Sequence, residues 1–306
     1  MAFGDQFLRE PALFPARLAG TAGGENEAWL DIPGGPYRVG GLSDAQSSAL
    51  AARYEDRCEA ASGAAHAVGI STFTVSEDEF VPHERSGRLN TFDFAYHEHS
   101  VHLAGHRMMA QISWRPVLTA ALWTPLEEGP EFLETFENFF RTVVAYRLLE
   151  CGGAVLHSSG VTDGSKAWLF YGHSGAGKTT IARRSLEVGH QVLSDDINAL
   201  YLEEGIPVVA KMPFAGEFGY TNDRIGPFPV AGLHALKQAP ENSWRAVSKA
   251  SAVASLVSCA PFLNHDPYRL PRLMENLEEV VATTLAGVLS FNLEGDFWTL
   301  LESQPA

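Results

Sequence analysis

The stretch Gly172-His173-Ser174-Gly175-Ala176-Gly177-Lys178-Thr179 decides the fold of the C-terminal half of this chain. It fits the pattern G-x-x-x-x-G-K-[ST], whose glycines let successive backbone N–H groups close around phosphate oxygens. An apolar run at 167–171 precedes it, and a helical pattern at 179–188, closed by Gly189, follows it. A strand, a glycine-rich loop and a helix in this order predict a phosphate-binding loop at a helix N-terminus.

The residue types of the loop predict a nucleotide with its metal ion. The lysine of such a loop reaches the β- and γ-phosphates, and the following hydroxyl is a ligand of Mg²⁺. The expected cofactors are therefore ATP and Mg²⁺. The predicted nucleotide contacts are Gly172, His173, Ser174, Gly175, Ala176, Gly177, Lys178, Thr179 and Thr180.

Two further features stand close to the loop in the predicted fold. Asp195-Asp196 ends the predicted strand at 191–194, so this pair is expected at a strand's carboxyl end beside the phosphates. One carboxylate can hold Mg²⁺ there and one can accept a proton from an attacking hydroxyl, unless the pair is a surface turn or a helix cap. His157 ends the predicted strand at 154–161 and is either a partner of the γ-phosphate or a structural histidine.

Leu156-His157, the loop and the segment 189–196, Gly-His-Gln-Val-Leu-Ser-Asp-Asp, together resemble the HPr kinase/phosphorylase family. The resemblance covers roughly residues 152–196 and implies a P-loop kinase core of the phosphoenolpyruvate carboxykinase type. It implies that Asp196 takes the proton from an acceptor serine, next to Asp195, and that His157 and Lys178 assist at the phosphates. It also makes a homo-oligomer an expectation.

The chain departs from that family downstream of the loop. The family's magnesium-binding glutamate aligns by distance with Thr221, and the nearest acid is Glu217, so the metal ligands expected are Thr179, Asp196 and Glu217. The family's C-terminal region and its N-terminal regulatory domain are not recognisable. These departures indicate a divergent relative whose acceptor is another serine-bearing peptide or a small hydroxyl compound.

The hydrophobic pattern predicts an α/β fold, α+β overall, in three segments. Residues 1–128 form an N-terminal domain, with a helix at 43–61 capped by Ser43 or Asp44 and an antiparallel meander at about 65–125. Residues 129–152 form a linking helix that ends at a glycine pair, and residues 153–306 form the kinase domain, with a hairpin around 203–205. Three aromatic residues near the C-terminus are expected in its core: Phe291, Phe297 and Trp298.

Composition limits the function classes. The 306 residues carry a net charge of −15, which disfavours a nucleic-acid binder. The three cysteines are too few for a disulfide framework, no apolar run is long enough to cross a membrane, and the first residues lack the features of a signal peptide, so a cytoplasmic protein is expected. Residues 1–150 contain no lysine and have a net charge of −10. We expect this half to provide acceptor recognition or a lid, favouring a basic acceptor.

These observations favour an ATP-dependent kinase over three alternatives. A transport-type or motor ATPase would need a Leu-Ser-Gly-Gly-Gln-like signature, which is absent, and a GTPase would need an Asn-Lys-x-Asp motif, also absent. A nucleotide-sensing module without transfer chemistry remains the other alternative. A histidine run in the first half has the spacing of metal ligands on a strand, but it crosses a predicted turn, which favours a solvated hairpin: His97, His99, His102 and His106.

Overall fold

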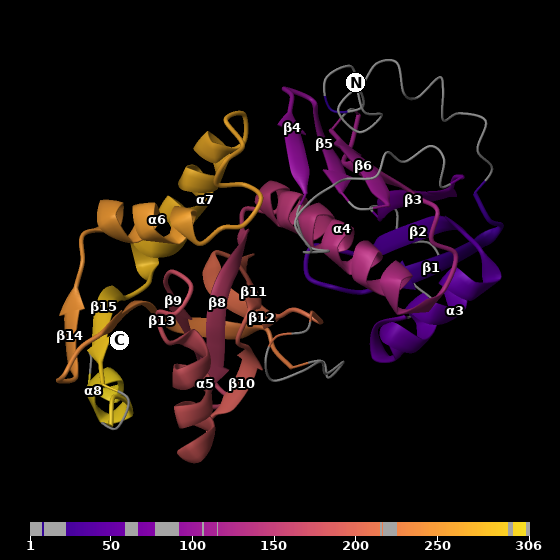
Figure 1. Cartoon of the computed structure of the whole chain (residues 1–306). Coiled ribbons are helices and arrows are strands. Elements are labelled where there is room, and N and C mark those ends of the chain that lie inside the picture. Colours follow the sequence, from indigo (N-terminus) through magenta and orange to yellow (C-terminus); the bar gives the residue numbers. More distant parts are fainter. Residues whose placement is uncertain are drawn as a thin grey trace. The chain divides into compact units, whose positions relative to one another are not determined.

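The computed structural model describes residues 8, 23–58, 67–76, 92–105, 107–114, 116–214, 216, 225–292 and 296–303. The chain divides into two compact units, Met1–Val143 and Val144–Ala306, and each unit contains its own mixed β-sheet (Figure 1). The fold is therefore mixed α/β. Within the described ranges, no helix is both long enough and apolar enough to cross a bilayer.

The N-terminal unit is built on a seven-stranded sheet in the order β1-β2-β3-β7-β6-β5-β4. The strands β4 to β7 pair antiparallel with their sequence neighbours, as the meander prediction requires. The strand β3 differs, because it is parallel to both β2 and β7. Parallel neighbours need a crossover connection, and the segment that contains α3 provides it between β2 and β3. The strands are β1 (Asn26–Leu30), β2 (Tyr37–Leu42), β3 (Val68–Thr74), β4 (Asp93–Tyr96), β5 (Ser100–Gly105), β6 (Met108–Ser113) and β7 (Thr119–Thr124).

The helix α3 (Asp44–Arg53) begins at the predicted cap but ends earlier than predicted. Ser43 Oγ accepts from the N–H of Gln46, and Gln46 Oε1 accepts from the N–H of Ser43, which is a capping box. After Arg53 the chain turns into a short 3-10 helix at Glu55–Arg57. Tyr54, at the turn, is fully buried with its ring edge-on to Phe140. Burial of this ring, which the apolar spacing of the sequence predicts, accompanies the end of the helix.

The long helix α4 (Gly129–Glu150) contains the boundary between the two units. An aromatic stripe on its first part is fully buried, with Phe136 stacked on Phe140. Its last turn ends at the predicted glycine pair: Gly152 has a φ of +77°, and Gly153 N–H donates to Leu148 O. Asn276 Nδ2 donates to Leu149 O and to Gly153 O at 2.8 and 3.1 Å. A buried side chain from far along the sequence therefore satisfies the carbonyls at this helix end.

The C-terminal unit has an eight-stranded sheet in which β9 pairs with both β8 and β13. This double pairing closes a ring of five strands, β8-β11-β12-β13-β9. The predicted hairpin between β11 and β12 is confirmed, with positive φ at Glu204 and Gly205. The strands are β8 (Ala154–Thr162), β9 (Ala167–Tyr171), β10 (Gln191–Ser194), β11 (Ile197–Glu203), β12 (Ile206–Lys211), β13 (Phe228–Gln238), β14 (Ser243–Ala246) and β15 (Ala286–Phe291).

The described part of this unit also contains the helices α5 to α8. Figure 1 shows α5 (Lys178–Glu187) alongside β8 and β10, and α6 (Lys249–Ser258) packs against α7 (Leu270–Thr283). The aromatic residues Phe291, Phe297 and Trp298 are buried together, the last of them in α8 (Trp298–Glu302), so the predicted core is confirmed. The strand β13 was not predicted, because Pro229 and Gly232 interrupt its apolar pattern.

Candidate functional site

The glycine-rich stretch forms the loop between β9 and α5. Gly175 and Gly177 have φ of +79° and +106°, conformations that residues with a Cβ rarely adopt. Gly177 is also the N-cap of α5, and the ring of Phe291 occupies the space that a side chain there would need. The predicted strand, loop and helix are therefore all present. The loop ends on the helix N-terminus, where the partial positive charge of the helix dipole favours an anion.

Lys178 is the cation of this loop. Its Nζ donates to the carbonyls of Gly172 and His173 at 3.0 and 3.3 Å, and the residue is buried. Burial lowers the pKa of Lys178 from its ordinary value, and the carboxylates of Asp195 and Asp196 act in the opposite direction. Two carbonyls of the loop thus hold the lysine beside the loop whose N–H groups would bind phosphate oxygens.

Thr179 and Asp195 form the first pair of side chains in the site whose oxygens could bind a metal ion. Thr179 Oγ1 donates to Asp195 Oδ2 at 3.1 Å, and Asp195 is only 6 % exposed. A Cβ added at Gly216 would overlap with Asp195 Oδ1 and would lie 3.2 Å from the Cβ of Asp196. Gly216 therefore lies directly against the aspartate pair. A hydroxyl and a carboxylate are the ligands that Mg²⁺ takes at phosphate loops, so these residues fit a magnesium ion.

Asp196 and His157 form a second pair. The distance from His157 Nε2 to Asp196 Oδ1 is 3.6 Å, and both side chains are partly open, at 45 % and 32 % exposed. His157 lies in the middle of β8 and not at its end, since β8 extends to Thr162. Burial lowers the pKa of His157 below its ordinary value, the ammonium of Lys178 adds to the decrease, and Asp196 and Asp195 oppose it. The imidazole is therefore neutral at neutral pH.

The turn that carries the two aspartates is held by buried hydrogen bonds. Ser194 Oγ accepts from the N–H groups of Asp196 and Ile197, each at 3.2 Å. Asn198 Nδ2 donates to Ser158 O at 2.8 Å and to Ser194 O at 3.3 Å. These bonds tie the turn between β10 and β11 to β8. The two adjacent carboxylates consequently keep different directions, one toward Thr179 and one toward His157.

A cavity of about 450 Å³ brings most of the predicted site residues together. Sequence reasoning missed two of its lining residues, Gly216 and Gln238, whose Nε2 donates to Gly175 O at 2.9 Å. No local pattern marks either residue. Glu217 lies outside the described residues. The cavity is lined by His157, Ser174, Gly175, Gly177, Lys178, Thr179, Thr180, Asp195, Asp196, Gly216 and Gln238.

Three residues of the histidine run, His97, His99 and His102, lie on the hairpin formed by β4 and β5. The prediction of a solvated hairpin is wrong for His102, which is only 1 % exposed. The rings of His97 and His102 meet edge-to-face at 5.2 Å, and His99 Nε2 lies 3.6 Å from Glu98 Oε1. Burial and the neighbouring His97 lower the pKa of His102 to about 4. His106 lies outside the described residues. In the described part of the chain, no three histidine, cysteine or acidic side chains gather as metal ligands would.

Comparison with known proteins adds no assignment to this geometry: neither a protein-family model nor a curated protein sequence matches the chain.

Proposed function

We propose that this chain is a Mg²⁺-ATP-dependent kinase that transfers the γ-phosphoryl group to a serine-type hydroxyl of a peptide, protein or small molecule. One observation carries the proposal. Two pairs of side chains, Thr179–Asp195 and His157–Asp196, line the same cavity as the phosphate loop and its lysine. Phosphoryl transfer requires a site for the nucleotide phosphates, ligands for the metal ion and a group that accepts the proton of the acceptor. The loop fits the first requirement, the Thr179–Asp195 pair the second, and the more exposed His157–Asp196 pair the third.

The first pair supports nucleotide binding. Thr179 and Asp195 would hold Mg²⁺, which when bound neutralises charge on the β- and γ-phosphates. The metal ligands expected from the sequence were Thr179, Asp196 and Glu217, and the last of these lies outside the described residues. The hydrogen bond from Thr179 to the buried Asp195 favours Asp195 instead of Asp196 as a metal ligand. Lys178 and the loop N–H groups would orient the same phosphates.

The second pair supports transfer to an acceptor. Asp196 is exposed enough for a hydroxyl to reach its carboxylate, and His157 stands beside it in its neutral form. In the proposed step the acceptor oxygen bonds to the γ-phosphorus as the bond to the β,γ-bridging oxygen breaks. The acceptor proton passes to Asp196, and ADP leaves with the bridging oxygen. A positioned base of this kind contributes about 10²- to 10⁴-fold to the rate.

Paired substitutions test the two roles separately. Candidate acceptors are serine peptides with basic neighbours and free serine, assayed for transfer from radiolabelled ATP. We expect Asp196→Asn to bind Mg²⁺-ATP within about threefold of the wild type and to lose about 10²- to 10⁴-fold in transfer. We expect Asp195→Asn to lose the Mg²⁺ dependence of ATP binding.

The same assay distinguishes the proposal from its alternatives. Rapid ATP hydrolysis without phosphoryl transfer to any of the added acceptors would favour an ATPase. Nucleotide binding without any turnover would favour a sensing module. If Asp195→Asn proves harmless to Mg²⁺-ATP binding while Asp196→Asn abolishes it, the assignment of the two carboxylates is reversed.

A further inference from the structure

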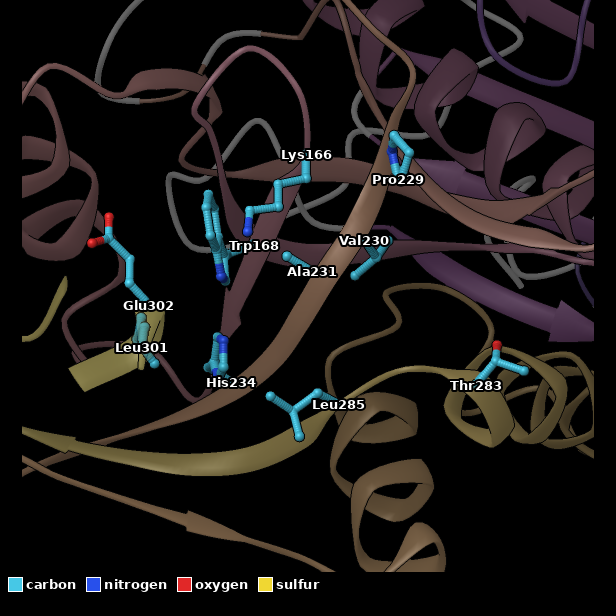
Figure 2. Close-up of a pocket in the computed structure, with 10 residues that line it drawn as sticks. All are labelled: Lys166, Trp168, Pro229, Val230, Ala231, His234, Thr283, Leu285, Leu301 and Glu302. Atoms are coloured by element: carbon cyan, nitrogen blue, oxygen red, sulfur yellow. The ribbon is translucent and has the colours of Figure 1, made fainter. Parts of the chain in front are cut away.

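A hollow on the sheet of the N-terminal unit is larger than the cavity that Figure 2 shows in the C-terminal unit. The cavity in Figure 2 has a volume of about 270 Å³, and its charged lining residues, Lys166 and Glu302, have opposite signs. The hollow has a volume of about 550 Å³, within the range of small-molecule sites. Among its lining residues in the described part of the chain, Arg38 alone is charged. The hollow therefore combines a ligand-sized volume with one cation.

The hollow lies on the face of the seven-stranded sheet that points away from α4. The buried ring of Tyr37 lies edge-on to Phe140 of α4, with the ring centroids 5.1 Å apart. Successive residues of a strand point to opposite faces, so Arg38, the next residue of β2, points away from α4. Its Cα partner on β3 is Gly69, whose partner on β7 is Thr119. Neighbouring strands therefore bring these lining residues together on one face.

Small residues form the floor of the hollow. Gly69 and Ser71 share a face of β3, and Ser71 is paired with Ala121 of β7. A Cβ added at Gly69 would meet nothing within 4 Å, and the same holds for Gly40, the partner of Ser71 on β2. The space above these residues is therefore open, as a ligand site requires.

The aromatic end of the hollow is formed by Phe73 and Trp123, which are Cα partners on β3 and β7. Their rings are stacked, with centroids 5.6 Å apart and 13° between the ring planes. Phe73 is only partly buried, so a ligand can reach its ring. It lies four residues beyond Gly69 on β3, which is about 13 Å along the strand. An elongated small molecule can therefore contact both Phe73 and Arg38.

Arg38 is the cation at the opposite end. Its side chain is 56 % exposed, and its Nη1 lies 3.9 Å from Glu27 Oε2. Trp29 Nε1 donates to the other oxygen of that carboxylate at 3.0 Å. An exposed ion pair at this distance contributes little, so the guanidinium keeps donors for a second carboxylate, which it can bind through two parallel hydrogen bonds. Gln111 and Thr119 add an amide and a hydroxyl to the lining.

We infer that this hollow binds a small aromatic carboxylate, with its ring against the Phe73–Trp123 stack and its carboxylate at Arg38. Aromatic rings favour a further ring in an edge-to-face or offset contact. A carboxylate complements the one cation of the hollow, and an amide-like linker can hydrogen-bond to Gln111 and Thr119. The volume leaves room for a bicyclic ring and a short linker, since a cavity of about 150 Å³ holds benzene. The inference uses no residue of the phosphate-loop site and does not depend on the proposed kinase activity.

Fluorescence titrations of the full chain with three dansyl probes test the ring and the charge together. Dansylglycine has a bicyclic ring, a sulfonamide linker and a carboxylate. Dansylamide has the same ring without the carboxylate, and dansylcadaverine ends in a cation instead. We expect dansylglycine to bind at least about fivefold more tightly than either, because only its carboxylate pairs with Arg38. Equal or tighter binding of dansylamide or dansylcadaverine, or no saturable binding of dansylglycine up to its solubility limit, overturns the inference.

An arginine variant and its matched control locate the carboxylate. Arg38→Met keeps an unbranched side chain and removes the guanidinium, so we expect it to weaken dansylglycine binding about tenfold and to leave dansylamide binding within about twofold. Arg272→Met is the control, because the Arg272 side chain is 54 % exposed and also lies near a carboxylate, with Nη1 3.4 Å from Glu275 Oε2. We expect this control to bind dansylglycine as the wild type does. Undiminished binding by Arg38→Met, or an equal loss in Arg272→Met, contradicts the assignment.

A third variant locates the ring. Gly69→Phe fills the hollow from its floor, and we expect it to abolish the binding of dansylglycine and dansylamide. Undiminished dansylglycine binding by the folded variant overturns the inference. Arg38→Met changes an exposed side chain and tests the site even if Gly69→Phe fails to fold. A wild type that binds no probe and forms a dimer that Gly69→Phe dissociates would assign this face to a second copy of the chain, which also overturns the inference.

Discussion

Gly216→Ala tests the geometry of the site without changing any group that does chemistry. An alanine Cβ at this position would overlap with Asp195 Oδ1 and lie 3.2 Å from both Asp195 Cγ and Asp196 Cβ. To relieve that overlap the carboxylate has to move by roughly 1 Å, which changes the geometry of the 3.1 Å hydrogen bond that Asp195 Oδ2 accepts from Thr179. The substitution therefore disturbs the pairing of Thr179 with Asp195 while leaving both residues in the chain.

The loss of rate that we expect is large for the addition of one methyl group. A displacement of about 1 Å at a reacting centre can cost about 10²-fold in rate, or roughly 2.7 kcal/mol in transition-state stabilisation. Overpacking should also lower the free energy of unfolding by about 1–3 kcal/mol. Both effects originate at the aspartate pair. The turnover rate should therefore decrease together with the gain in ATP affinity that Mg²⁺ provides.

The assay compares ATP affinity in Mg²⁺ with ATP affinity in a chelator, followed by the turnover rate. We expect Gly216→Ala to lose most of the tightening that Mg²⁺ provides and to keep its affinity without the metal within about threefold. Gly40→Ala is the control, because a Cβ there meets nothing within 4 Å. If Gly216→Ala keeps the wild-type Mg²⁺ response and turnover, Asp195 does not act with Thr179 at the metal, and this reasoning is refuted.

Three more predictions address other contacts. Lys178→Ala should leave the thermal midpoint within a few degrees and weaken ATP binding by at least about tenfold by calorimetry, because the loop lysine binds phosphate; unchanged affinity would contradict the phosphate-loop assignment. Burial lowers the pKa of His234 from an ordinary 6.5 to about 3, so the neutral ring stabilises the fold fully above pH 6.5 and this contribution is lost as the pH falls toward 3. Compared with His234→Phe in denaturant titrations, the wild type should lose roughly 1.4 kcal/mol more per pH unit in that window, and parallel curves would argue against a buried neutral imidazole. Asn276→Ala should lower the free energy of unfolding by about 1–3 kcal/mol, because it leaves the buried carbonyls of Leu149 and Gly153 without this donor, and a change below about 0.5 kcal/mol would show that they find another partner.

Local sequence determined the parts of this protein whose conformation depends on near neighbours. The loop at 172–179, the helix that follows it and the end of α4 at Gly152 were predictable, because glycines with positive φ and apolar periodicity act within a few residues. The β11–β12 hairpin was predictable for the same reason, from Glu204 and Gly205.

Only the tertiary structure decided which residues share the site and what each one faces. Asp195 and Asp196 are adjacent, and sequence alone could not assign one to Thr179 and the other to His157. That assignment depends on the turn held by Ser194 and on its attachment to β8. Gly216 reaches the pair from outside the predicted site, and β13 forms although its apolar pattern is interrupted. Side-chain direction at a turn and contacts between distant strands depend on the whole packed chain, which local periodicity does not encode.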